Sequence, residues 1–405
     1  MNKGQDGRAS GCSMTTPVSL EMIRETSSSR GEPQWLTDAR LEAFSTYQKL
    51  EAPQWRRTDI KGLDFEGLAG QAFAVGASFV THHFGKLDGV NHMSLALAAR
   101  EHEDVLKPLM QLSPRADKWE ALQAALWVDG NYLHIAKDAN IERPLEMTDT
   151  FTPKGGLVRN VLVADQSAKA HVLLTATGGA PGAFAAQGTE VQVAPNANLT
   201  LTALQDVDHA ATLLAWRRAH IQRDATLSWV DGQFGAKTSV TINENLLVEP
   251  GANVHFIAAF FGSQDQHLDM TTAALHDAPH TSSQLDIKGA LNDHAYAANY
   301  AITNIGHDAP NSSGHQHQET LLLSNKARAD AIPKLDVENN EVSASHGATV
   351  GQVDPDQLFY LRSRGFEELP AKRLIVEGFF DPLLARIPIE SVRESMRTSL
   401  LARLH

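Results

Sequence analysis

The residues best suited to chemistry in this sequence are three histidines toward its end: His315, His317 and His346. His315 and His317 flank a single glutamine. Because alternate residues of a β-strand point to the same face, these two imidazoles could meet one metal ion. A metal-dependent hydrolase would need a third ligand, which stacked strands could supply from His276, His280 or His307. The alternative is two polar side chains on the solvated face of a strand.

His346 lies among small residues, between Ser345 and Gly347. Glycine permits tight turns, so this pattern predicts a turn from which the imidazole reaches outward. In that position it could bind a ligand or carry a proton at a surface that a partner covers. The alternative is a turn histidine whose ring is hydrogen-bonded locally.

Several familiar catalytic patterns are missing from the sequence. The glycine-rich residues 178–182 lack the lysine of a phosphate-binding loop and include a proline, and no Gly-x-Ser-x-Gly elbow occurs. The sequence has one cysteine, Cys12, whereas an iron–sulfur cluster normally needs several thiolates. We therefore expect no catalytic residue and no cofactor that this chain holds stably by itself.

Charge and hydropathy argue against two kinds of partner. The formal net charge is −13, which disfavours binding to nucleic acid or to an anionic membrane. No apolar run reaches the roughly 18–20 residues that a membrane-spanning helix needs. A single cysteine fits a reducing compartment, so we expect a cytoplasmic protein. Residues 1–32 are rich in serine, glycine and charge, which predicts a disordered leader.

Hydrophobic periodicity divides the rest of the chain into three predicted domains. Residues 33–145 carry helical stripes, including one predicted helix over 91–110, and end at a first strand near 132–135. From 146 to 352, short β-prone runs alternate with turn residues, and the later turns lie about 15 to 17 residues apart. Residues 353–405 return to helical patterns. Many short strands with regular turns suggest a solenoid, a sandwich or a propeller, and the small residues within the runs favour a β-solenoid.

A short helix with an unusual surface is predicted directly after the β region. Asp354 can cap it, Pro355 suits its first turn, and Gly365 can end it. Its aromatic and cationic side chains are of the kind that anchor protein interfaces. The candidate docking residues are Leu358, Phe359, Tyr360, Arg362, Arg364 and Gly365. The alternative is a helix with one packed face and one solvated face.

Taken together, several motifs resemble the SufD branch of the SufB/SufD family, the scaffold proteins of iron–sulfur cluster assembly. The strongest is residues 345–351 followed by 354–365, and the similarity covers most of the chain after Pro33. The supporting motifs are residues 53–59, 129–144, 280–282, 288–289, 316, 321–324 and 333–337.

The resemblance implies a mainly β protein with a right-handed parallel β-helix core between N-terminal and C-terminal helical domains. It implies pairing with SufB across the ends of the two β-helices and docking of the ABC-type ATPase SufC on the C-terminal helices. Any ATPase activity would then belong to SufC. Any iron–sulfur cluster would be transient and shared with SufB, with His346 at that interface as a candidate shared ligand. Whether a homodimer forms when both partners are missing stays open.

One position departs from the family pattern. Many SufD members have a cysteine two residues before the histidine that matches His346, and this chain has Ala344 there. Any thiolate at this place must therefore come from SufB. Besides the metal-dependent hydrolase, the rival hypothesis is a β-helix enzyme acting on polysaccharide, which would carry clustered carboxylates on an exposed sheet face.

Overall fold

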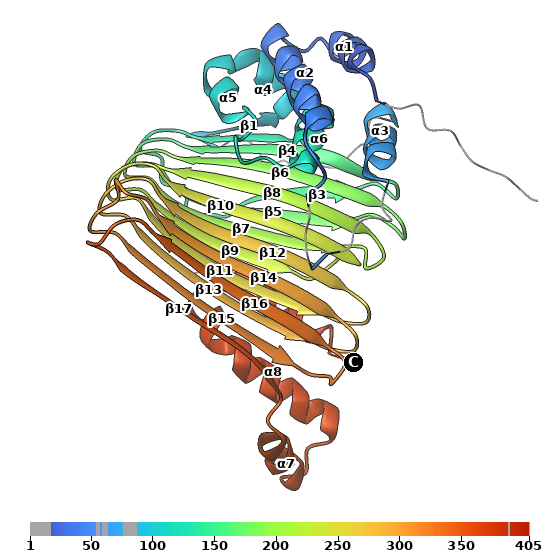
Figure 1. Cartoon of the computed structure of the whole chain (residues 1–405), viewed down its shortest axis with the longest axis vertical. Helices are drawn as coiled ribbons and strands as arrows, with labels where there is room; N and C mark the ends of the chain where they lie inside the picture. Colours follow the sequence, from blue (N-terminus) through green and yellow to red (C-terminus); the bar gives the residue numbers. More distant parts are fainter. Residues whose placement is uncertain (1–17, 54–56, 59–63, 76–86, 388, 405) are drawn as a thin grey trace, which may run out of the picture.

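The computed structural model describes residues 18–405 except 54–56, 59–63, 76–86, 388 and 405. Helices lie at both ends of a central stack of β-strands (Figure 1). The strands form a β-solenoid of about eight turns, which confirms the mainly β class predicted from the sequence. No described helix is both long and apolar enough to cross a membrane.

The solenoid consists of two sheets whose strands alternate along the chain. Even-numbered strands form the nine-stranded sheet, which begins with β1, and odd-numbered strands form the eight-stranded sheet. All pairings are parallel except β1 with β2. The nine-stranded sheet comprises β1 (Val90–Ser94), β2 (Asn131–Ile135), β4 (Gly155–Ala164), β6 (Phe184–Val193), β8 (Thr212–Ile221), β10 (Thr238–Leu247), β12 (His267–His276), β14 (Tyr296–Ile305) and β16 (Arg328–Val337). The eight-stranded sheet comprises β3 (Leu145–Phe151), β5 (Lys169–Gly178), β7 (Asn198–Val207), β9 (Thr226–Gln233), β11 (Asn253–Gly262), β13 (Ser282–Leu291), β15 (Ser313–Leu322) and β17 (Ser343–Gln352).

Left-handed backbone at the corners lets the chain pass from one sheet to the other. At one of the corners, a residue with positive φ recurs once per turn. Most of these residues are small or polar and tolerate the left-handed region. They are Asp138, Ser167, Asn196, Asp224, Gly251, His280 and Asn311. The number of residues in a half-turn, from one corner to the next, is close to the spacing between the turn signals in the sequence.

Apolar side chains fill the space between the two sheets. Because side chains alternate across a strand, every second residue points inward and stacks on the equivalent residue of the next turn. Leu201, Trp229, Phe256 and Leu285 form one such fully buried row. Farther along the strands the interior becomes polar, with Asp149 and Arg217 buried among amide side chains.

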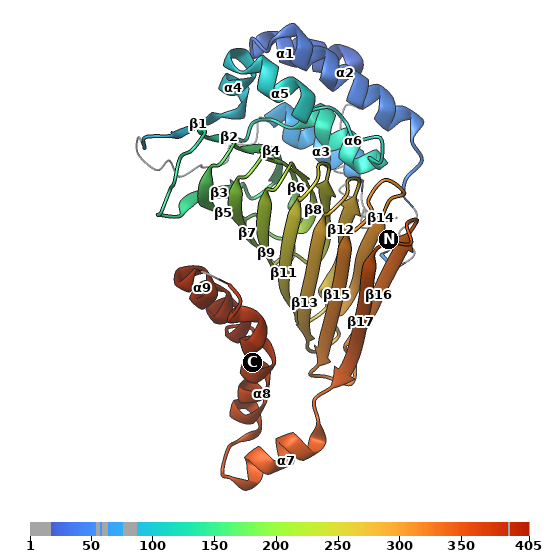
Figure 2. The ribbon, with the colours of Figure 1, turned by 90° about the vertical axis from the view of Figure 1, so that its left-hand side faces the viewer.

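The N-terminal helices cover the outer face of the first strands of the nine-stranded sheet (Figure 2). They are α1 (Leu20–Ser29), α2 (Gln34–Lys49), α3 (Phe65–Val75), α4 (Leu95–Glu101), α5 (Glu103–Leu109) and α6 (Lys118–Leu126). Two expectations are wrong in part here. Residues 20–29 form a helix with Ile23 fully buried, so the expected disorder of residues 1–32 does not extend to them, and residues 1–17 lie outside the described part. The helix expected over 91–110 is confirmed only from Leu95, where it is divided into α4 and α5; its first residues form β1, because pairing with β2 outweighs their helical pattern.

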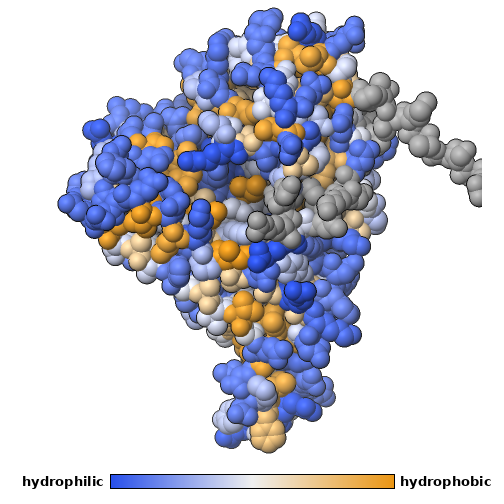
Figure 3. Space-filling model, viewed as in Figure 1, coloured by the Kyte–Doolittle hydropathy of each residue, from blue (hydrophilic) through white to orange (hydrophobic). Residues whose placement is uncertain are grey.

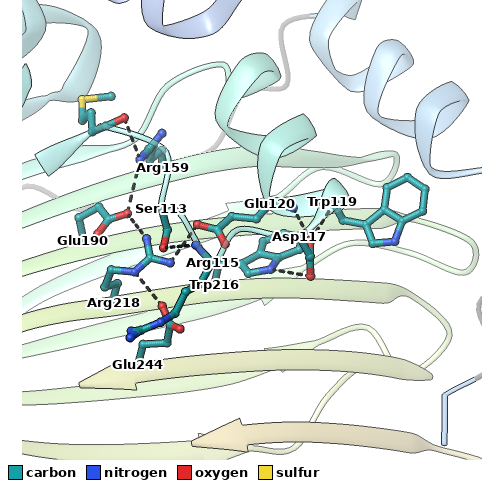
Figure 4. Close-up of polar contacts among 11 residues, drawn as sticks. Ser113, Arg115, Asp117, Trp119, Glu120, Arg159, Glu190, Trp216, Arg218 and Glu244 are labelled. Carbon is teal, nitrogen blue, oxygen red and sulfur yellow. Dashed lines mark hydrogen bonds and ion pairs between the residues drawn. The ribbon is translucent and has the colours of Figure 1, made fainter. Parts of the chain in front are cut away.

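A buried network of ion pairs joins α6 to the sheet (Figure 4). Arg218 of β8 contacts three carboxylates, those of Glu120, Glu190 and Glu244, at 3.1, 3.4 and 2.8 Å. Arg159 of β4 also lies 3.4 Å from Glu190. Burial, opposed by Arg218 and reinforced by Glu190 and the neighbouring Asp117, raises the pKa of Glu120 from 4.5 to about 7.

This network predicts that the chain loses stability as the pH rises toward 8. A carboxyl group whose folded pKa exceeds its unfolded value stabilises the fold fully below pH 4.5, and that stabilisation is lost as the pH rises through about 7. We expect Glu120→Gln to reduce the difference in unfolding free energy between pH 5 and pH 8 by about 2 kcal/mol. Urea titrations at the two pH values measure this. Glu103→Gln, at an exposed position, is the control, and an unchanged pH dependence in Glu120→Gln would contradict the assignment.

The C-terminal helices pack on the outer face of the other sheet. They are α7 (Pro355–Ser363), α8 (Glu368–Leu384) and α9 (Glu390–Leu401). Val376 and Phe380 of α8 and Met396 of α9 are buried in one apolar cluster with Ile257 and Phe261 of β11. By contrast, α7 buries no residue. The predicted cap is confirmed, since the Asp354 side chain accepts a hydrogen bond from the backbone N–H of Asp356, and Gly365 follows the helix with φ of 96°.

Candidate functional site

Among the residues that the structure describes, none pairs with the free edge of the last turn of the solenoid. Strands β16 and β17 end their sheets, so each is paired on one side only. Inward-facing residues of earlier turns are buried, whereas those of this turn are exposed or half-buried. Val337 of β16 is 41% exposed and Val350 of β17 is 39% exposed, although both point inward by register. An unpaired strand edge together with exposed core-type side chains is a surface suited to receive another sheet.

His346 lies on the inner side of this last turn. It is not in a turn, as the sequence suggested, but within the ten-residue strand β17, in register with Gln316 of β15. The parallel pairing with β15 explains the difference, because a full ladder outweighs the turn preference of Gly347. Gln316 is buried and faces inward, so His346 also points inward while remaining exposed at the open end.

Gln316 supports His346 from the turn below. Its amide nitrogen donates to Thr303 Oγ1 at 2.7 Å and to the Lys334 backbone oxygen at 3.0 Å. These bonds tie β15 to β14 and to β16 across the interior. The side chain under His346 is therefore fixed by two neighbouring strands of the opposite sheet.

His315 and His317 point to the opposite, outer side of β15. His315 Nδ1 lies 2.7 Å from Ser345 Oγ, and His317 Nε2 lies 2.7 Å from Glu319 Oε1. They share one face as predicted, but within the described residues no three histidine, cysteine, aspartate or glutamate side chains form a group that could hold a metal ion.

The three histidines considered as a third ligand lie elsewhere. His276 is buried in the interior, where Thr281 Oγ1 and Ser283 Oγ lie 2.8 Å from its two ring nitrogens. Burial lowers the pKa of His276 to about 4. His280 occupies a corner with φ of 58°, and His307 is exposed beside Asp308. A neutral histidine with both nitrogens engaged is an interior packing residue.

The predicted docking helix α7 has no buried residue, and most of its side chains are exposed. Phe359 is 73% exposed, and the guanidinium of Arg364 lies 5.1 Å from the ring centre of Tyr360. Arg362 lies 3.9 Å from Glu368 of α8. Figure 3 shows apolar side chains among polar ones at this end of the molecule. A groove of about 610 Å³ runs between α7 and α8, lined by Asp354, Asp356, Gln357, Tyr360, Leu361, Leu374 and Ile375.

The sequence reading missed other exposed apolar residues beside this helix. These residues are Phe366, Leu369 and Leu374, whose side chains are exposed. Of the six proposed docking residues, Leu358 is only half-exposed. The sequence reading also missed Val337 and Val350 at the open end. A signal was available for these two, because their alternating pattern continues the inward rows of the earlier strands.

Comparison with known proteins identifies the family. The model for the SufBD core domain of SUF-system iron–sulfur cluster assembly matches residues 148–379. A SufBD family iron–sulfur cluster assembly protein of Staphylococcus aureus (strain MRSA252) is 26% identical over 423 aligned positions, covering 93% of this chain and 91% of the relative. A relative from Staphylococcus epidermidis (strain ATCC 12228 / FDA PCI 1200) shows the same identity and coverage. The family model spans the solenoid from β3 into α8, and the chain therefore belongs to the SufBD family of the SUF system for iron–sulfur cluster assembly.

Proposed function

We propose that this chain is the SufD-type scaffold subunit of a SUF complex. It pairs with a SufB-type subunit through the last solenoid turn and docks the SufC-type ATPase on its C-terminal helices. The observation that carries the proposal is the open end, with its two free strand edges, exposed Val337 and Val350, and inward-pointing His346. A second solenoid end would pair those edges and bury those side chains.

The cysteine content favours the SufD role over the SufB role. Cys12 is the sole cysteine of the sequence and precedes the solenoid. A nascent iron–sulfur cluster, the cargo of the complex, would thus take its thiolates from the partner. At the paired ends, His346 can contribute one imidazole nitrogen as a ligand or proton carrier. Binding of ATP would bring two SufC subunits together, move the C-terminal helices and expose this interface.

The test is co-expression with the SufB-like and SufC-like proteins of the same host, followed by anaerobic size-exclusion chromatography with mass detection. A complex containing one copy of this chain with both partners supports the proposal. A chain that elutes alone, or as a homodimer that excludes the SufB-like protein, contradicts it. Pairing at nanomolar affinity would correspond to about −12 kcal/mol.

We expect His346→Ala to impair cluster assembly without breaking the complex. The substitution removes one imidazole from an already exposed site, so pairing should persist. The rate of cluster formation on the complete complex should fall about tenfold or more, as for one lost interaction in the rate-limiting step. Absorption spectroscopy under anaerobic conditions measures it. His315→Ala, on the outer face, is the matched control, and equal rates for both variants would remove His346 from the mechanism.

The docking surface makes a separate prediction. Phe359→Ala with Arg362→Ala should weaken binding of the SufC-like ATPase by about 100-fold, since aromatic and arginine anchors dominate such interfaces. Titration calorimetry measures the affinity. Leu20→Ala with Arg24→Ala, an exposed pair on α1, is the control. Unchanged affinity in the first variant would place the ATPase elsewhere.

A further inference from the structure

Lys288 of β13 connects α8 to the outer face of the solenoid. Its Nζ donates to the backbone oxygen of Phe379 at 3.0 Å and lies 4.6 Å from the centre of the Phe379 ring. The same nitrogen lies 2.7 Å from Glu319 Oε2 on the neighbouring strand β15. One ammonium group therefore holds a helix of the C-terminal region and a strand next to the open end.

Glu319 passes this connection on to His317. One carboxylate oxygen faces Lys288 and the other accepts from His317 Nε2 at 2.7 Å. Burial raises the pKa of Glu319, but the hydrogen bonds from Lys288 and His317 outweigh it, and the net shift is downward. The carboxylate is therefore ionised and divided between the two donors.

His317 lies directly against the last strand. Its register partner in β17 is Gly347, the residue after His346. A Cβ atom at Gly347 would come within 3.4 Å of His317 Nδ1, so the imidazole packs closely over the backbone of β17 at this point. Polar contacts thus lead from α8 through Lys288 and Glu319 to His317, and a packing contact of the imidazole leads on to the strand that carries His346.

The position of α8 determines whether Lys288 keeps this arrangement. Phe380, next to Phe379, is 1% exposed and anchors α8 on the sheet. If α8 moves away, Lys288 loses a carbonyl acceptor and an aromatic face and gains water. Its pairing with Glu319 then weakens, because ion pairs are weaker in a higher dielectric.

We propose that Lys288 is a positioning residue that couples the docking of α8 to the orientation of His317, which lies on β15 against β17. The inference rests on the proposed function, in which the ATPase moves the C-terminal helices, and it adds the residues through which the open end senses that movement. By linkage, a partner bound at the open end would in turn change the affinity for the ATPase.

Nuclear magnetic resonance of ¹⁵N-labelled histidine in the full chain tests the coupling without any partner. In the wild type at pH 8, the hydrogen bond to Glu319 favours the tautomer with the proton on Nε2 of His317. Lys288→Met should shift the His317 ring signals away from their wild-type positions, because the Glu319 carboxylate is then no longer divided between two donors. Phe380→Ala, which loosens α8 but leaves all three relay residues in place, should shift them in the same direction.

Combination and control variants make the test specific. Adding Phe380→Ala to Lys288→Met should shift the His317 signals no further, and Lys288→Arg should restore most of the wild-type signal. Lys372→Met removes an ion pair within α8, that of Lys372 with Glu368 at 2.8 Å, and should leave His317 unchanged. Unchanged His317 signals in Lys288→Met, or additive shifts in the double variant, would overturn the coupling. A wild-type chain that binds no ATPase would overturn the proposed function instead.

Discussion

Replacing both Val337 and Val350 by aspartate is expected to abolish pairing with the SufB-like subunit at the open end while the chain stays folded. Both valines point inward in the last turn yet are 41% and 39% exposed, so the isolated chain can solvate a carboxylate there. In a paired complex the same groups would be buried without a partner charge. At about 2–3 kcal/mol for each desolvated group, the affinity for the SufB-like subunit should fall by roughly 1000-fold or more.

Matched surface variants separate this effect from a general one. Leu97 of α4 is 42% exposed, so Leu97→Asp makes the same kind of change on the N-terminal helices. Leu97→Asp should leave pairing intact. Circular dichroism should show the same strand content in the wild type, in Leu97→Asp and in the double valine variant. Analytical ultracentrifugation with the SufB-like protein gives the affinities. If Val337→Asp with Val350→Asp paired as tightly as Leu97→Asp, the open end would not be the interface.

The repeating pattern of the β region favoured a solenoid over a sandwich or a propeller without excluding them, because each half-turn is a local unit of strand and corner. Which face a given residue occupies was not predictable in the same way. A shift of one residue in the register between β15 and β17 would exchange His346 with its neighbours on the outer face. The register is set by pairing along ten residues and by the interior row beneath it, and neither is visible in the residues around His346 alone.

The docking helix was easier to predict because its signals are local. Asp354, Pro355 and Gly365 define its ends within a few residues, and the structure places all three as expected. Its neighbours on α8 were missed since they come from a separate helix, and only the tertiary fold brings Leu374 beside Tyr360. The same limit applies to Lys288, whose contact with Phe379 joins residues far apart in the sequence.

The polar interior of the solenoid was not predicted at all, and it should matter strongly for stability. Arg217 is 2% exposed, and its guanidinium donates to Asp231 Oδ1 at 2.6 Å and to Gln187 Oε1 at 3.3 Å. Asp231 also accepts from the amides of Gln233 and Asn243. These amides carry no charge, so they solvate the carboxylate without neutralising it.

Arg217→Met should therefore lower the free energy of unfolding by about 3–5 kcal/mol, the usual cost of leaving one buried charge without its partner. Replacing both partners, Arg217→Met with Asp231→Leu, should recover part of that loss, because the charge of Asp231 is then gone, although buried Asp149 still loses the favourable charge of Arg217. Urea unfolding followed by far-ultraviolet circular dichroism measures both variants. If the effects of Arg217→Met and Asp231→Leu on the free energy of unfolding simply added in the double variant, the two residues would not act as a pair. A recovery would show that the arginine neutralises Asp231 inside the solenoid.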